Sequence, residues 1–176
     1  TNSCEAGTSV GDNCIIKIEN GKKVTYCPTL TEDLEEDPSG ANRPVLAEGM
    51  IPITYDGTNW VKADVYGAYN NWYDYGNQKW ANAVMVTTAK RDTYMNADVG
   101  TTIPENDILA YYVWIPRYEF TITSSQYAQP AAGRTEVRFI SGTSKETDIG
   151  YKIPEAFKFN EQELTGYWAM KYTAGE

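Results

Sequence analysis

Alternation of apolar and polar residues is the dominant pattern along this chain, and it is longest between residues 108 and 122. The even positions of this stretch are apolar from Tyr112 to Ile122, whereas the odd positions are apolar at first and polar from Arg117 onwards. This pattern predicts a strand that is buried on both faces at its start and on one face at its end. Pro116, near the middle, predicts a bulge or a kink.

Shorter β patterns lie on either side of this stretch. Residues 50–55 predict a strand whose proline, Pro52, favours an edge of the sheet. We expect a turn at Asp56-Gly57 and a return strand over residues 59–63. Residues 73–81 repeat the order Tyr-Asp, glycine, tryptophan found over residues 55–60, which predicts a second aromatic hairpin. Further strands are expected over 81–88, 135–140 and 164–172, and one or two helical turns over 90–97. The expected fold is mostly β, an antiparallel sheet or sandwich with at most one short helix.

A hairpin is predicted near the N-terminus, because Asn20-Gly21 stands between two β-forming segments. Folding the chain about this turn places residues 15 to 19 opposite residues 26 to 22, and Cys14 opposite Cys27. At that non-hydrogen-bonded position the Cα atoms lie about 4.5 Å apart, which a disulfide tolerates. We therefore expect a Cys14–Cys27 disulfide that pins the hairpin and indicates an extracellular setting. Three free thiols in a cytosolic protein, or a Cys4–Cys14 pair, are the alternatives.

The chain is expected to divide into three segments. Residues 1–30 form the hairpin annex, residues 31–44 an acidic linker, and residues 45–176 a main β-rich domain that is truncated at its C-terminal end. Five carboxylates between Glu32 and Asp37 also suggest a calcium loop, although their spacing is not that of an EF-hand.

Composition excludes several classes of function. The chain has 15 Lys and Arg against 24 Asp and Glu, a net charge of −9, which argues against binding to nucleic acid and to anionic membrane surfaces. It has no histidine, which excludes Ser-His-Asp and Cys-His catalysis and histidine-containing metal sites. No apolar run approaches the ~20 residues of a transmembrane helix. We expect a protein that is not an enzyme, with no catalytic residue, no cofactor and no metal.

Aromatic residues supply the candidate site, because 14 Tyr and 5 Trp stand against only 4 Phe. The candidates are six aromatic residues from the 21-residue stretch 60–80, interleaved with Asn and Asp: Trp60, Tyr69, Trp72, Tyr73, Tyr75 and Trp80. Such a cluster is typical of rings that pair across strands and cover a sheet. The alternative is a ligand or partner surface, on which the rings stack against sugars and the polar groups hold hydroxyls.

Several strings resemble a known family. They are Val45–Ile53, Tyr55–Trp60, Trp72-Tyr73-Asp74-Tyr75, Trp80–Val84 and Val113-Trp114-Ile115-Pro116-Arg117-Tyr118. Together they resemble surface-exposed, pilin-like and phage-tail-like proteins of gut Firmicutes and their phages, over about residues 44–172. In that family the string that here runs from Glu163 to Tyr172 opens a further domain, similar to the C-type-lectin fold of the formylglycine-generating enzyme. The resemblance implies an extracellular, cell-surface or virion location.

The leading functional prediction is a non-catalytic extracellular structural or interaction module, either a subunit of a surface appendage or filament or a stalk that presents a distal domain. Its partners would be proteins, through self-association or through a distal domain of the same polypeptide. The alternative is a carbohydrate-binding adhesin or phage receptor-binding module that holds a glycan on its aromatic surface. A weaker alternative is a glycosidase or its accessory domain, which rests on the abundance of carboxylates.

Overall fold

The computed structural model describes residues 15–19, 22–26, 37–65, 70–122 and 135–172. The chain divides into two compact units, residues 1–35 and residues 36–176, and each unit is described by itself. In the first unit, β1 (Ile15–Glu19) pairs with β2 (Lys22–Tyr26) in an antiparallel hairpin. Ile15 lies opposite Tyr26 and Glu19 opposite Lys22, so the predicted register is confirmed. Cys14 and Cys27 lie outside the described residues.

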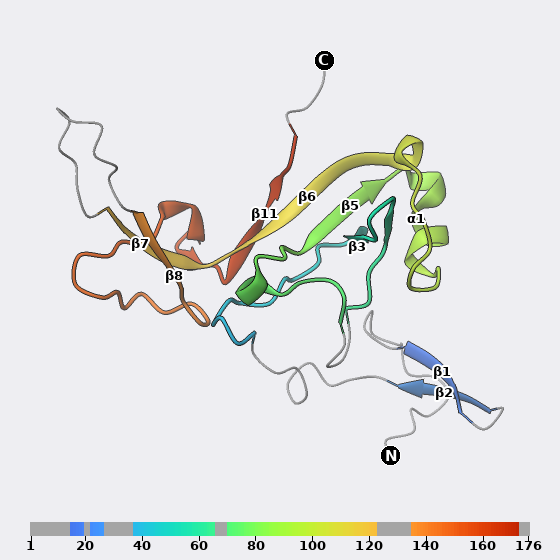
Figure 1. The fold of residues 1–176 in the computed structure, drawn as a ribbon, viewed down its shortest axis with the longest axis horizontal. Coiled ribbons are helices and arrows are strands. Elements are labelled where there is room, and N and C mark those ends of the chain that lie inside the picture. Colours follow the sequence, from blue (N-terminus) through green and yellow to red (C-terminus); the bar gives the residue numbers. More distant parts are fainter. Residues whose placement is uncertain (1–14, 20–21, 27–36, 66–69, 123–134, 173–176) are drawn as a thin grey trace. The chain divides into compact units, whose positions relative to one another are not determined.

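The second unit is built on a five-stranded antiparallel sheet with the order β11-β6-β5-β3-β4 (Figure 1). Its strands are β3 (Met50–Tyr55), β4 (Trp60–Lys62), β5 (Asn82–Val86), β6 (Ile108–Pro116) and β11 (Gly166–Met170). Two small hairpins accompany it: β7 (Tyr118–Ile122) with β8 (Thr135–Phe139), and β9 (Lys158–Phe159) with β10 (Gln162–Glu163). The described residues hold one α-helix, α1 (Thr88–Met95), so the mostly β prediction with one short helix is confirmed.

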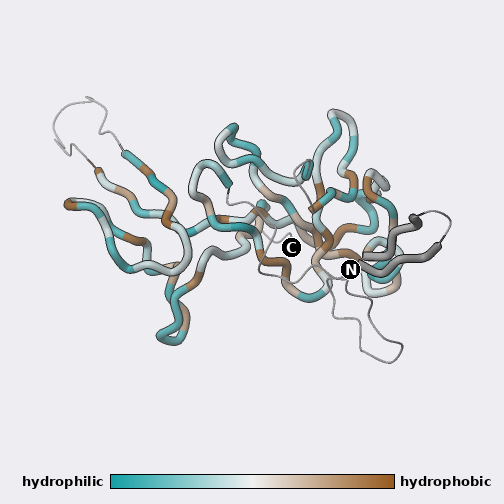
Figure 2. Tube along the Cα trace, turned by 90° about the horizontal axis from the view of Figure 1, so that it is seen from below, coloured by the Kyte–Doolittle hydropathy of each residue, from teal (hydrophilic) through white to brown (hydrophobic). Residues whose placement is uncertain are grey.

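Both faces of the five-stranded sheet are covered by other parts of the same unit. One face carries Ile51, Ile53, Val84 and Val86, which pack against Tyr94 of α1 and Ile103. The opposite face carries Ala63, Ala81 and Trp114, which pack against Ala41, Trp72 and Tyr75. Hydrophobic and hydrophilic stretches alternate along the chain accordingly (Figure 2). Within the described residues the second unit is therefore one five-stranded sheet accompanied by loops, one α-helix and two small hairpins, and no second large sheet packs against it to form a sandwich.

Residues 37–44 belong to the segment predicted as a linker. They contribute to the core that contains Trp114. Asp37 is buried and its carboxylate accepts hydrogen bonds from the backbone N–H groups of Ser39 and Tyr75. Ala41 is buried among the aromatic rings of the core. Asp37 thus caps its own turn and binds the 3-10 turn that begins at Tyr75.

The prediction that Pro52 marks an edge strand was wrong, because β3 lies between β5 and β4. The backbone carbonyl of Pro52 accepts a hydrogen bond from the N–H of Ala63, one residue beyond the end of β4. In an antiparallel strand the nitrogen and the carbonyl of one residue face the same neighbour. The Pro52 nitrogen, which has no hydrogen to donate, therefore faces the end of the short strand β4. An interior strand tolerates proline there because little of the ladder is lost.

The kink predicted at Pro116 separates β6 from β7, but the predicted burial of β7 was wrong. The polar residues Arg117 and Glu119 are buried, whereas the apolar residue Ile122 is exposed. Polar groups are buried here because loops supply them with hydrogen-bond partners. The second aromatic hairpin was also not found: residues 75–77 form a 3-10 turn, closed by an isolated bridge between Asp74 and Lys79.

Candidate functional site

The aromatic residues predicted as one cluster lie on opposite faces of the sheet. Trp72, Tyr73 and Tyr75 belong to the core that contains Trp114, and the ring of Trp80 meets that of Tyr75 edge to face at 5.4 Å. Trp60 packs on the other face, with the core that contains Tyr94. Tyr69 lies outside the described residues. The structure therefore brings Trp72, Tyr73, Tyr75 and Trp80 together and separates Trp60 from them.

Of the four rings on the Trp114 face, Trp72 and Tyr75 are buried core, Tyr73 is partly buried against that core, and Trp80 is 41% exposed. The Trp72 side chain is 4% exposed, and its Nε1–H donates to the Asn82 carbonyl at 2.7 Å. Burial raises the pKa of Tyr75 above its ordinary range. Neighbouring rings lie 5.4 to 5.7 Å apart, from Trp72 through Tyr73 to Tyr75. Rings that are packed and hydrogen-bonded in this way cover the sheet and leave no open stacking surface at Trp72 or Tyr75.

Trp60, in contrast, lines an open hollow of about 570 Å³ on its own face of the sheet. Four rings follow one another along it, with centroids 5.4 Å apart from Tyr55 to Trp60, 6.0 Å from Trp60 to Tyr111 and 5.6 Å from Tyr111 to Tyr172. Tyr55 is 55% exposed and Tyr172 is 61% exposed. We call this the Trp60 hollow; its remaining wall is formed by Thr58, Asn59 and residues 102–105.

Two opposite charges lie beside these rings. The ammonium nitrogen of Lys171 is 4.8 Å from the centroid of the Trp60 ring, a cation–π contact, and burial lowers the pKa of this lysine. Glu105 forms part of the wall of the hollow. Burial, followed by the negative charge of Glu105, raises the pKa of Tyr111. The site offers ring faces, hydroxyl groups and one charge of each sign.

Comparison of the chain with protein-family models, curated proteins and solved structures finds no match. Function must therefore be argued from the geometry of the chain. Among the described residues, no group of three or more His, Cys, Asp or Glu side chains is placed to hold a metal ion. Nor does that part of the chain contain a helix long and apolar enough to cross a membrane.

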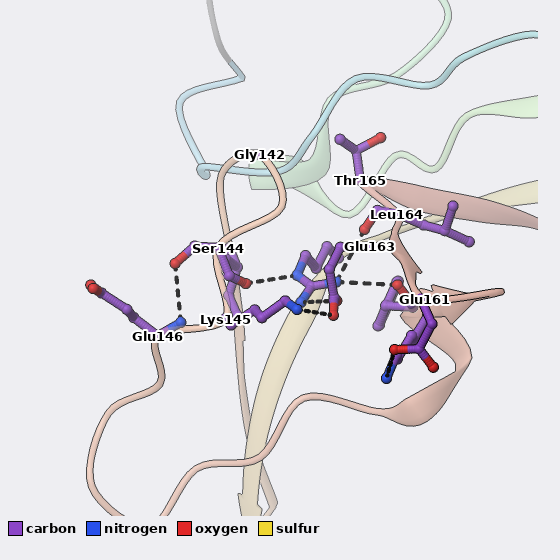
Figure 3. Close-up of polar contacts among 12 residues, drawn as sticks. Gly142, Ser144, Lys145, Glu146, Glu161, Glu163, Leu164 and Thr165 are labelled. Carbon is purple, nitrogen blue, oxygen red and sulfur yellow. Dashed lines mark hydrogen bonds and ion pairs between the residues drawn. The ribbon is translucent and has the colours of Figure 1, made fainter.

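The string Val113–Tyr118, on which the family resemblance partly rests, has a structural role. Arg117 is 1% exposed, and its guanidinium donates to the carbonyls of Ser144, Phe157 and Leu164 at 3.0 to 3.3 Å. It also binds the Glu163 carboxylate at 2.8 Å, and Lys145 binds the other oxygen of Glu163 at 3.1 Å (Figure 3). These contacts attach three segments, at residues 144–145, at residue 157 and at residues 163–164, to the kink between β6 and β7.

A repeated element that forms part of the Trp60 hollow was not recognised in the sequence. Residues 98–105 and 148–155 share the order Asp, Val or Ile, Gly, two variable residues, Ile, Pro, Glu. In both copies the glycine has a positive φ, 84° at Gly100 and 87° at Gly150, and a 3-10 turn begins at the glutamate. The positive φ explains the shared glycine. This eight-residue repeat, whose two copies lie 50 positions apart, is the feature of the sequence that could have identified residues 102–105 as part of a defined structural element.

Proposed function

We propose that the chain is a non-catalytic extracellular module that works through protein–protein contacts, as a subunit of a surface appendage or as a stalk that presents a distal domain. The observation that supports this proposal is the outer edge of β11. β11 is the last strand of the sheet, and within the described residues no backbone hydrogen bond uses its outer edge. An open edge of this kind can accept a further strand.

The register of β11 shows which of its backbone groups face outward. Lys171 donates its N–H to Tyr111, and Arg117 donates its N–H to Thr165, so the odd residues of β11 face β6. The N–H and C=O groups of Gly166, Trp168 and Met170 therefore face away from the sheet; Gly166 is buried and Trp168 is half-buried, so the edge is most accessible at Met170, which is 50% exposed. The occupant that we propose for this edge is a strand of a second copy of the chain.

The extracellular location is supported by the cysteines. The confirmed register of β1 and β2, continued by one residue, would place Cys14 opposite Cys27. We infer that the two form a disulfide that pins the hairpin, and that the chain acts outside the reducing cytosol.

Proline substitution at Met170 tests the edge. The Met170 N–H faces outward, so Met170→Pro removes one outward donor and no bond to β6, and an edge strand tolerates the proline φ. Met170→Thr is the matched control, because threonine keeps the N–H. Light scattering over a concentration series and negative-stain electron microscopy should show oligomers or filaments for the unchanged chain and Met170→Thr, and monomers for Met170→Pro. A monomer at every concentration in the unchanged chain would refute self-association through this edge.

A further inference from the structure

We propose that the Trp60 hollow binds a short neutral oligosaccharide. This inference is independent of the proposed function, because the hollow offers side chains whereas the β11 edge offers backbone groups. The volume of about 570 Å³ lies within the roughly 300–1,000 Å³ of small-molecule sites. A sugar ring presents both apolar C–H faces and polar hydroxyl groups, so a sugar site needs both stacking faces and polar groups.

The stacking faces are supplied by two exposed tyrosines set against a fixed floor. Tyr55 packs on Trp60 and Tyr172 packs on Tyr111, and these two floor rings lie 6.0 Å apart. Trp60 and Tyr111 are themselves packed against the buried core of this face. The outer rings are therefore presented to solvent on a floor that does not have to form when a ligand arrives.

Hydrogen-bonding groups stand around the rings. The side chains of Thr58, Asn59, Thr102 and Glu105 line the hollow, and none of them makes a hydrogen bond to another described residue. They offer hydroxyl and amide donors and carbonyl and carboxylate acceptors. A polyhydroxylated ligand can use donors and acceptors together, whereas an apolar ligand would leave them unpaired.

The charges favour a neutral ligand over a charged one. An anion would meet Glu105 in the wall and a chain whose net charge is −9. An organic cation would compete with the Lys171 ammonium, which already lies over the Trp60 ring. Neither charge obstructs a sugar, because both can form charge-assisted hydrogen bonds with hydroxyl groups.

Hydrogen bonds hold the walls of the hollow in place. Asp56 accepts the N–H groups of Thr58 and Asn59, both at 2.8 Å, and these bonds, that of Asn59 first, lower the pKa of Asp56. On the opposite wall, Ile103 donates its N–H to the Trp60 carbonyl at 3.0 Å. Pre-organised walls reduce the entropic cost of binding.

Saturation-transfer-difference NMR of the full chain tests the proposal, with maltotriose, cellotriose, chitotriose and mannotriose as probes at millimolar concentration. Choline chloride and sodium sulfate are the charged probes. We expect at least one trisaccharide to bind, and Tyr55→Ala or Tyr172→Ala to weaken it by about tenfold or more. Both tyrosines are exposed, so the variants should stay folded. Phe159→Ala is the matched control, an exposed ring (67%) outside the hollow, and should bind like the unchanged chain.

Three outcomes would overturn the proposal. One is that no trisaccharide of the panel binds. Another is that the affinity is unchanged in both tyrosine variants, which would place the sugar elsewhere. The third is that choline or sulfate binds more tightly than every trisaccharide in a manner sensitive to Tyr55→Ala. Monomeric behaviour of the chain would leave these results unaffected, so this proposal and the self-association proposal can fail separately.

Discussion

At the scale of single residues, two polar side chains with many contacts to other described residues, Asn42 and Arg117, are structural. Asn42 donates its side-chain amide to the carbonyls of Ile140 and Thr165 at 2.8 and 2.9 Å, and its own oxygen accepts the N–H of Gly142. Asn42 and the buried Arg117 both form hydrogen bonds that join segments far apart in the sequence. Each satisfies backbone groups that would otherwise be costly to bury.

Replacing Arg117 with methionine should therefore lower the free energy of unfolding by about 3–5 kcal/mol, because three backbone carbonyls lose their donor and the Glu163 carboxylate keeps only Lys145 as a partner. Urea unfolding followed by circular dichroism measures the change. Arg138→Met is the matched control: Arg138 pairs with Asp148 but is 51% exposed, and its loss should cost less than about 1 kcal/mol. Equal effects of the two substitutions would contradict the role assigned to Arg117.

Packing around position 166 leaves room only for a glycine. A Cβ atom at this position would lie 2.4 Å from the Trp114 ring and 2.7 Å from the Ile115 carbonyl. Gly166→Ala should destabilise the chain by about 1–3 kcal/mol through overpacking, as a lower thermal midpoint would show. Gly76→Ala is the control, since its Cβ would meet nothing closer than 3.5 Å. A midpoint of Gly166→Ala that matched the Gly76→Ala value would contradict this packing.

At the scale of elements, the sequence predicted most strands and the single helix, because their patterns are local. The β1–β2 register follows from Asn20-Gly21 alone, and β3 begins and ends where residues 50–55 predicted. The strand order could not be predicted, because it depends on pairings such as Met50 with Met85 and Tyr112 with Met170. The burial of Arg117 and Glu119 was missed for the same reason, since their partners come from distant loops.

The contact between α1 and the loop before β6 predicts a pH dependence. The hydrogen bond that Tyr94 donates to the Asp107 carboxylate raises the pKa of Tyr94 to about 12 from an ordinary value of 10. Stability from this group is therefore complete below pH 10 and is lost as the pH rises from 10 to 12. The difference in unfolding free energy between the unchanged chain and Tyr94→Phe, measured by urea titration, should be constant from pH 8 to 10 and shrink above it. A difference that grows with pH would contradict the assignment.

The hairpin carries a chemical prediction of its own. If Cys14 and Cys27 are linked, alkylation of the unreduced, denatured chain should label Cys4 alone, and reduction should make all three cysteines reactive. Peptide mapping by mass spectrometry identifies the labelled residues. Cys4→Ser should leave the result for the other two unchanged. Labelling of all three cysteines before reduction would refute the disulfide and remove the main support for an extracellular location.

At the scale of the molecule, the aromatic residues divide into two populations that composition cannot distinguish. On one face, Trp72, Trp114 and Trp168 donate their indole N–H groups to the carbonyls of Asn82, Asn42 and Val45. On the other, Trp60 belongs to a run of rings that ends in two exposed tyrosines. The sequence indicated a single aromatic cluster over residues 60–80, which the structure divides between the two faces. Which rings face solvent depends on which loop covers which face, and this could not be deduced from spacing.

Both hydrophobic cores of the second unit are made of residues between Ala41 and Trp168, which leads to a final prediction. Because these cores lie wholly within residues 36–176, a chain without residues 1–35 should keep its cooperative unfolding, with a thermal midpoint within about 3 °C of the full chain. Differential scanning calorimetry of both chains measures this. The Arg117→Met substitution should lower the midpoint equally in both, because the Arg117 contacts also lie within residues 36–176. Loss of cooperative unfolding in the shortened chain would show that the hairpin unit is needed to complete the fold of the sheet.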